Sequence, residues 1–125
     1  MSVPADLKYT AEHEWIRVEG DEVVVGVTDF AQGELGDVVF IEIETEGEDL
    51  SKGETFGTIE AVKTVSDLYM PLDGKVLEVN PDLEDTPELV NSEPFKGGWM
   101  IRIKMANASQ LDDLMSAEEY SVLIG

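Results

Sequence analysis

Apolar and polar residues alternate along several short segments of the chain, and each such segment predicts a β-strand. The clearest is residues 38–44, whose second half alternates apolar and acidic side chains and so predicts a half-buried strand. Further strands are expected at residues 12–18, 23–27, 53–59, 65–70, 75–79 and 99–105. Short strands separated by glycine turns predict a mainly β fold, either a sandwich or a flattened barrel.

Helical patterns are few and short. Residues 28–35 predict a helix that begins with a threonine cap. Another is expected at residues 86–90, with threonine as cap and proline at its first position. Capping-box spacing at residues 109–112 and 116–119 predicts two helices at the C-terminus, whose apolar stripes we interpret as core.

Residues 57–71 predict a β-hairpin with Lys63 in its turn, because two β-rich runs are bounded by glycine and proline. A tight turn between antiparallel strands holds its side chains in water at a fixed position. A modifying enzyme can reach an amine held in this way. The alternative is that Lys63 is an ordinary solvated lysine, as most turn lysines are.

Length and composition limit the class of protein. The chain has 125 residues, which predicts one domain over residues 1–125, and its formal net charge is −20. That charge argues against nucleic acid or anionic membrane as a partner. The negative charge is explained either by adaptation of the protein to a salt-rich host or by electrostatic steering of the protein toward basic partners. No apolar run approaches a membrane span and residues 1–4 resemble no targeting peptide, so we expect a cytoplasmic or processed mitochondrial-matrix protein.

The residues needed for self-contained catalysis are missing. There is no cysteine, which excludes disulfides and thiolate sites, and the single histidine, His13, excludes a multi-histidine metal site. No nucleophile elbow, phosphate loop or His-Glu-x-x-His motif occurs. Carboxylate pairs are expected by chance among 28 acidic residues. We therefore expect a protein that is not an enzyme, with Trp15 in the core and His13 in a structural hydrogen bond.

Seven blocks of sequence resemble the H-protein family of the glycine cleavage system and cover nearly all of the chain in order. They are residues 9–15 (YTAEHEW), 26–32 (GVTDFAQ), 35–40 (LGDVVF), 60–66 (EAVKTVS), 69–71 (YMP) with Gly74, 78–80 (EVN) and 98–101 (GWMI). The chain departs from the family pattern at Ala61, where serine is common, at Gly33 inside the short helix, and after residue 43, where a proline often follows.

The resemblance implies a lipoyl carrier with the barrel-sandwich hybrid fold of lipoyl and biotinyl carriers. Lys63 stands where that family carries lipoate through an amide. A pyridoxal-phosphate glycine decarboxylase (P-protein) would load an aminomethyl group on the lipoyl disulfide. A tetrahydrofolate-dependent aminomethyltransferase (T-protein) would unload it, and the flavin enzyme dihydrolipoamide dehydrogenase (L-protein) would reoxidise the dithiol. A lipoate ligase or lipoyl transferase would attach the group, and we expect the carrier to be a monomer.

The same resemblance suggests which residues would serve the arm. We expect Glu60, three residues before the lysine, to be recognised by the ligase. A shallow apolar cleft that shelters the loaded arm would be made by Val27, Ala31, Leu35 and Leu68. Carboxylates that hold the protonated amine would come from Glu12, Glu14 and Asp67, because a buried cation is costly without an anion nearby. For these three, a solvated surface position is the alternative.

Three other functions are considered for this chain. It could donate lipoate to other lipoyl enzymes, or be an acidic interaction domain that is never modified. A biotin carrier is disfavoured, because such hairpins usually present Met-Lys-Met and this one presents Val-Lys-Thr at residues 62–64.

Overall fold

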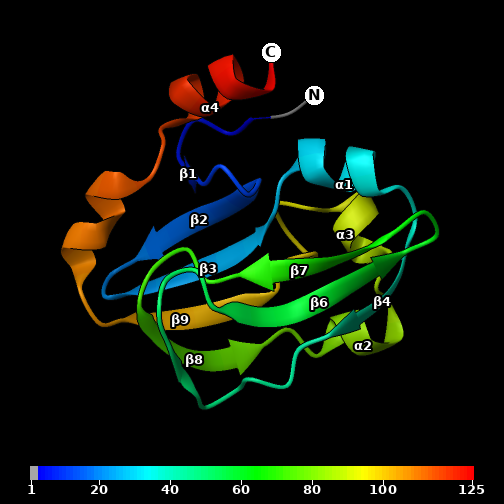
Figure 1. The fold of residues 1–125 in the computed structure, drawn as a ribbon, viewed down its shortest axis with the longest axis horizontal. Coiled ribbons are helices and arrows are strands. Elements are labelled where there is room, and N and C mark those ends of the chain that lie inside the picture. Colours follow the sequence, from blue (N-terminus) through cyan, green and yellow to red (C-terminus); the bar gives the residue numbers. More distant parts are fainter. Residues whose placement is uncertain (1–2) are drawn as a thin grey trace.

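Nine strands in residues 3–125, which the computed structural model describes, form two antiparallel sheets (Figure 1). The six-stranded sheet has the order β1-β2-β3-β9-β8-β5, and the three-stranded sheet has the order β4-β6-β7. The strands are β1 (Lys8–Tyr9), β2 (Glu14–Glu19), β3 (Glu22–Val27), β4 (Val38–Glu42), β5 (Asp49–Leu50), β6 (Thr55–Ala61), β7 (Val65–Tyr69), β8 (Gly74–Val79) and β9 (Ile101–Met105). Met1 and Ser2 lie outside the described residues. They belong to residues 1–4, in which the sequence predicts no targeting peptide.

Five short helices connect or cover these strands. They are α1 (Asp29–Leu35), α2 (Asp82–Asp85), α3 (Leu89–Ser92), the 3-10 helix η1 (Ala108–Asp113) and α4 (Ala117–Ile124). The hydroxyl of Thr28 accepts the Ala31 N–H at the start of α1, and Ser116 forms a capping box with Glu119 at the start of α4. The predicted caps at Thr28 and Ser116 are confirmed, as is a mainly β fold of the barrel-sandwich type.

Two predicted helices and several predicted strand ends differ from the structure. A helix that the sequence analysis did not predict, α2, begins at Asp82, whose N–H donates to the side-chain oxygen of Asn80. Thr86 therefore ends α2, and does not cap α3 as predicted. Residues 109–112 belong to a 3-10 helix capped by Asn107, so the predicted capping box there is wrong. Strands β2, β6 and β9 begin two residues later than predicted, and β4 ends two residues earlier.

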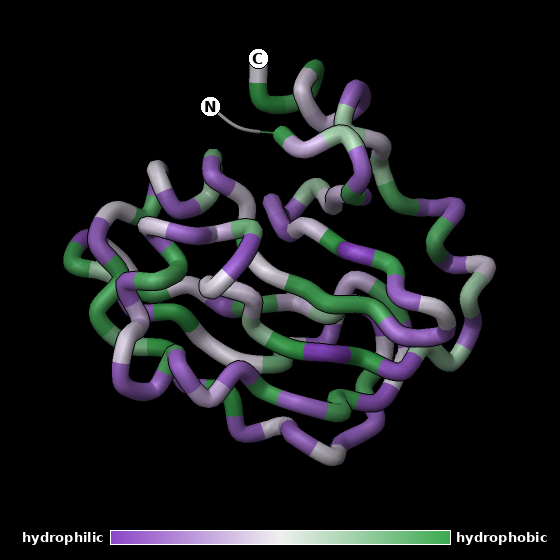
Figure 2. Tube along the Cα trace, turned by 180° about the vertical axis from the view of Figure 1, so that it is seen from behind, coloured by the Kyte–Doolittle hydropathy of each residue, from purple (hydrophilic) through white to green (hydrophobic). Residues whose placement is uncertain are grey.

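The main core lies between the two sheets. In Figure 2 the strand traces alternate between hydrophobic and hydrophilic colours, which reflects inward and outward side chains. Fully buried members from the large sheet include Ile16, Val25 and Ile101, and the small sheet contributes Ile59 and Leu68. The two sheets thus enclose one apolar layer, and their edges and turns are left to present functional side chains.

A second, smaller core lies on the other face of the large sheet, where α4 packs against β1 (Figure 1). The rings of Tyr9 and Tyr120 are stacked with centroids 4.7 Å apart. Trp15 is fully buried and donates its indole N–H to the carbonyl of Pro94, at 2.8 Å. The prediction that Trp15 is a core residue is confirmed.

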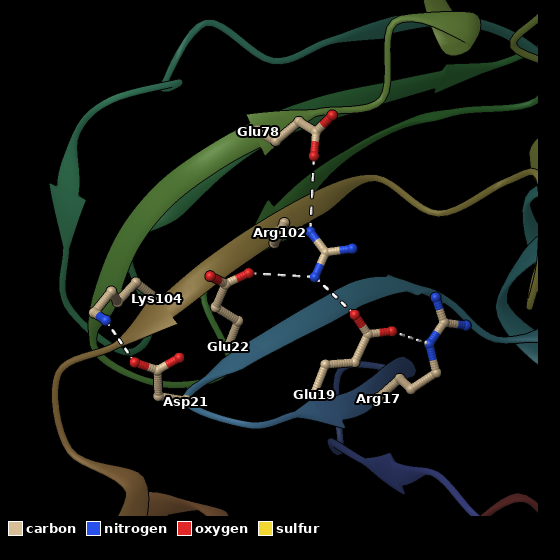
Figure 3. A network of polar contacts seen from close by, with 7 residues as sticks. All are labelled: Arg17, Glu19, Asp21, Glu22, Glu78, Arg102 and Lys104. Atoms are coloured by element: carbon tan, nitrogen blue, oxygen red, sulfur yellow. Dashed lines mark hydrogen bonds and ion pairs between the residues drawn. The ribbon is translucent and has the colours of Figure 1, made fainter.

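Ion pairs cross the outer face of the large sheet (Figure 3). Arg102 on β9 lies between Glu19, Glu22 and Glu78, which come from β2, β3 and β8. Glu19 also pairs with Arg17, and Lys104 pairs with Asp21. These contacts are partly or largely solvent-exposed, so each contributes little to stability. None of the helices in residues 3–125 is long and apolar enough to cross a bilayer.

Candidate functional site

Lys63 is exposed at the tip of the hairpin formed by β6 and β7, as the sequence pattern predicts. The strand ladder ends at the pair of Glu60 and Val65. Beyond that pair, the Ala61 N–H donates to the carbonyl of Thr64 at 2.8 Å and closes the turn. In Figure 1 the hairpin reaches the side of the molecule that holds α1, α3 and β4.

The tip is attached to the segment that joins α1 to β4. The N–H of Val62 donates to the carbonyl of Asp37 at 2.9 Å. Gly36, which ends α1, has φ 79° and ψ −159°, a conformation that L-residues avoid. A Cβ at Gly36 would lie 3.4 Å from Cε of Lys63. The aliphatic stem of Lys63 therefore runs across this glycine, beside the end of α1.

Asn91 on α3 holds the same segment from the other side. Its amide nitrogen donates to the carbonyl of Gly36 at 2.9 Å and to the side chain of Gln32 on α1 at 3.0 Å. Its amide oxygen accepts the N–H of Val38 at 2.9 Å. Residues on both sides of Asp37 are thus fixed by one side chain. Sequence reasoning missed Asn91, because its partners lie more than 50 residues away.

An apolar cleft of about 390 Å³ opens beside α1. All four residues expected to form a cleft line it: Val27 from β3, Ala31 and Leu35 from α1, and Leu68 from β7. Further lining residues that sequence reasoning missed are His13, Phe30, Glu34, Ile59 and Ser66. Leu35, one of the lining residues, directly precedes Gly36, which the Lys63 stem crosses; Gly36 and Lys63 themselves do not line the cleft.

The three expected carboxylates occupy different places. Glu12 and Asp67 line the apolar cleft. Glu14 does not; it lines a neighbouring pocket of about 550 Å³, which Glu12 also lines. Glu12 thus borders both hollows, and only Glu14 is removed from solvent, with 3% of its surface exposed.

Burial governs the chemistry of Glu14. Its carboxylate oxygens accept the Tyr69 N–H at 3.0 Å and the Thr10 hydroxyl at 3.3 Å. Desolvation raises the pKa of the Glu14 carboxyl to about 8, although both hydrogen bonds act to lower it. Close to neutral pH this carboxyl can therefore gain or lose a proton.

Two further residues that the sequence singled out are Glu60 and His13. Glu60 is exposed on β6, between Phe40 of β4 and Val65 of β7 in the strand register. Nδ1 of His13 lies 2.9 Å from the hydroxyl of Tyr120, so the predicted structural hydrogen bond is confirmed. His13 also has φ 66°, a strained value for a residue with a side chain.

Comparison with known proteins assigns the family. A family model described as glycine cleavage H-protein matches residues 7–124. The chain belongs to the glycine cleavage H-protein family. It is 54% identical to the glycine cleavage system H protein of Staphylococcus saprophyticus over 125 residues, covering 100% of this chain and 99% of that protein. It is 58% identical to that of Bacteroides thetaiotaomicron over 124 residues, covering 99% and 98%.

A solved structure supports the same family. The crystal structure of a glycine cleavage system H protein from Mycobacterium marinum matches with a TM-score of 0.90 and 38% identity. The match covers 98% of this chain and 99% of that one. H-proteins of this family are non-catalytic carriers that bear lipoate covalently on a lysine.

The residues of this chain fit lipoate. The group consists of an apolar chain with a sulfur ring, joined to a lysine by an amide, so it requires an accessible amine and an apolar surface beside it. Lys63 is exposed, and the cleft beside α1 has an apolar floor in which Val27, Ala31 and Leu68 are buried. Gly36 has no side chain that would obstruct the stem between the two.

Proposed function

We propose that Lys63 is the lysine that carries lipoate in this chain, and that the cleft beside α1 shelters the loaded arm. The chain is the lipoyl-bearing shuttle of the glycine cleavage system. The observation that carries the assignment to Lys63 is its exposed position at a hairpin tip, with its stem crossing Gly36, the residue that follows Leu35 of the apolar cleft.

Attachment uses only the Lys63 amine from this chain. Its nitrogen bonds to the carboxyl carbon of an activated lipoate, the activating group leaves, and the amine releases its proton. The product is an amide on a longer, uncharged stem. Once bound, lipoate supplies a disulfide that can accept an aminomethyl group and a dithiol that can be reoxidised.

The cleft residues would exclude water from the arm. Val27, Ala31, Leu35 and Leu68 offer an apolar surface, whose burial is favourable for an apolar chain. Glu12 and Asp67 supply the negative charge that a protonated amine requires at the edge of this surface. Glu14 lies in the pocket that shares Glu12 with the cleft, so it would act on an amine that passes beyond Glu12.

The partners follow from the family. The P-, T- and L-proteins of the glycine cleavage system load, unload and reoxidise the carrier. We propose in addition that a lipoate ligase or lipoyl transferase modifies Lys63, that the carrier acts as a monomer, and that it works in the cytoplasm. The bacterial relatives support a cytoplasmic location; a processed mitochondrial protein is the alternative.

The test compares Lys63→Arg with Lys52→Arg, which changes another exposed lysine. Arginine keeps the charge but offers no amine that can be acylated. After expression with lipoate and an active ligase, we expect a lipoyl mass on the Lys63 peptide of the wild type and of Lys52→Arg, and none in Lys63→Arg. Reconstituted glycine turnover should follow the same pattern. An unmodified wild type would favour an unmodified interaction domain, and turnover by Lys63→Arg would contradict the shuttle.

A further inference from the structure

Exposed apolar side chains gather around Lys63. Residues 3–125 include eight large hydrophobic residues that are exposed, and four of them lie at the hairpin tip or on the neighbouring start of β4. We call these four the tip patch; they are Val39, Phe40, Val62 and Val65, with exposed fractions of 50%, 47%, 72% and 61%. The other four lie elsewhere, two of them on α4.

The strand register explains why the tip patch is continuous. Phe40 on β4 is paired with Glu60 on β6, which is paired with Val65 on β7. Residues paired in this way project from the same face of a sheet, so Phe40 and Val65 flank Glu60. The register shifts at Val39, which makes this residue an outward bulge beside the row. Val62 extends the row into the turn, next to Lys63.

The fold does not require these side chains. The core between the sheets is filled by the inward residues of the same strands, Val38, Ile41 and Ile59. Polar residues are usual in an exposed turn, yet Lys63 follows one largely exposed valine and precedes another by two residues. An exposed apolar patch on a soluble domain often marks a surface that binds another protein.

The position of the patch indicates which partner binds there. An enzyme that acylates Lys63 must bring its activated carboxyl carbon to bonding distance of Nζ, so it must contact the residues around the stem. Enzymes that act on the far end of the arm have no such requirement. Acidic Glu60 lies inside the patch. Glu42, Thr58 and Asp67 form the next paired row on the same face of the sheet, farther from the tip. A partner with an apolar surface and basic residues around it would be complementary.

We propose that the tip patch is the docking surface for the enzyme that attaches lipoate to Lys63. This rests on the proposed function, in which Lys63 is the attachment site. It differs from the sequence interpretation, which assigned recognition to Glu60 alone. Burial of the apolar side chains supplies most of the binding energy, and Glu60 orients the basic residues of the partner.

The test uses the double variant Val62→Thr/Val65→Thr in the full chain. Threonine keeps the β-branched shape that suits these positions but replaces a methyl group with a hydroxyl. The control is Val122→Thr, because Val122 on α4 is 79% exposed and belongs to no part of the tip patch. The initial rate of Lys63 lipoylation by a purified ATP-dependent lipoate ligase is measured by mass spectrometry against the concentration of unmodified chain.

We expect KM of the double variant to rise about tenfold with kcat within a factor of two, and the control to match the wild type. A second readout needs no turnover: with Lys63→Arg as background, the same two threonines should weaken ligase binding about tenfold in calorimetry. If KM and ligase binding are the same for the wild type, the double variant and the control, the tip patch is not the docking surface, although Lys63 can still be the attachment site. A fall in kcat alone also overturns it. Absence of lipoylation in the wild type removes the proposed function itself.

Discussion

At the residue scale, Glu14 differs from every other carboxylate of the site, because it is almost completely buried. Its pKa is raised to about 8 by desolvation, whereas Glu12 and Asp67 are exposed. A cation placed beside Glu14 would favour the ionised form and so release its proton. The residue also links the stability of the fold to pH.

The direction of that linkage can be tested with Glu14→Gln. The folded pKa of about 8 lies above the unfolded value of 4.5, so the folded state holds an extra proton between these values. The stability of the fold therefore decreases as pH rises from about 4.5 to about 8, by on the order of 5 kcal/mol. Glutamine does not titrate. We expect the free energy of unfolding of Glu14→Gln to exceed that of the wild type progressively over this range.

Urea unfolding at half-unit pH steps measures this difference. The matched control is Glu118→Gln, which changes an exposed carboxylate in the first turn of α4. This variant removes one negative charge as Glu14→Gln does but keeps the buried Glu14 carboxyl, so its stability should decrease with rising pH as in the wild type. The same decrease in Glu14→Gln would show that Glu14 ionises in the folded protein as it does in the unfolded chain.

At the scale of elements, the hairpin tip is not free to move by itself. Asn91 on α3 fixes the segment between α1 and β4, and the carbonyl of Asp37 in that segment holds the N–H of Val62. The segment between α1 and β4, together with α3, thereby determines where the amine of Lys63 stands. A turn that is held by hydrogen bonds to other elements positions a reacting amine more precisely than an isolated turn would.

Removing the hydrogen bonds of Asn91 should make the hairpin tip more mobile. Asn91→Ala leaves the Val38 N–H and the Gly36 carbonyl without their partner, at a cost of about 1–3 kcal/mol. We expect hydrogen exchange at the Val62 amide to accelerate about tenfold or more, by NMR. Asn107→Ala, which removes the cap of η1, should lower stability without this local effect. If Val38 exchanges faster while Val62 does not, the two are not coupled.

Elements specified by neighbouring residues could be predicted from the sequence. The α1 helix follows from a Thr28 cap and Gly36, and α4 follows from the capping box of Ser116 and Glu119. The elements that were wrong depend on side chains that bond at a distance or just outside the expected cap. Asn80 accepts the Asp82 N–H at the start of α2, a helix that was not predicted, and Asn107 takes the role that was expected of Ser109.

In the candidate site, too, features encoded by neighbouring residues could be predicted, and long-range contacts could not. The hairpin pattern places Lys63, and the resemblance to a family suggested the four apolar residues that line one cleft. The contact between Gly36 and the Lys63 stem left no local signal, nor did the bonds of Asn91. The separation of Glu14 from the cleft also depends on how strands pack, because Glu14 bonds to the backbone of Tyr69, 55 residues away.

At the scale of the whole molecule, charge is distributed unevenly. Three of the eight basic residues, Arg17, Arg102 and Lys104, form ion pairs on the outer face of the large sheet (Figure 3). None of the ion pairs among residues 3–125 includes Glu12 or Asp67 at the cleft. Glu12 and Asp67 attract a cation at the cleft locally, and the net charge of −20 adds a long-range attraction for cations.

The loaded arm should therefore be held in part by electrostatics. We expect Asp67→Asn to increase formaldehyde release from the methylamine-loaded carrier about two- to fivefold at low ionic strength, as for the loss of one exposed ion pair. Glu118→Gln changes the net charge equally but lies on α4, so it should have little effect. At about 1 M salt, where the Debye length is about 3 Å, the difference between Asp67→Asn and the wild type should narrow. Equal release at low salt would mean that Asp67 does not hold the amine, and the apolar cleft alone would then have to account for its shelter.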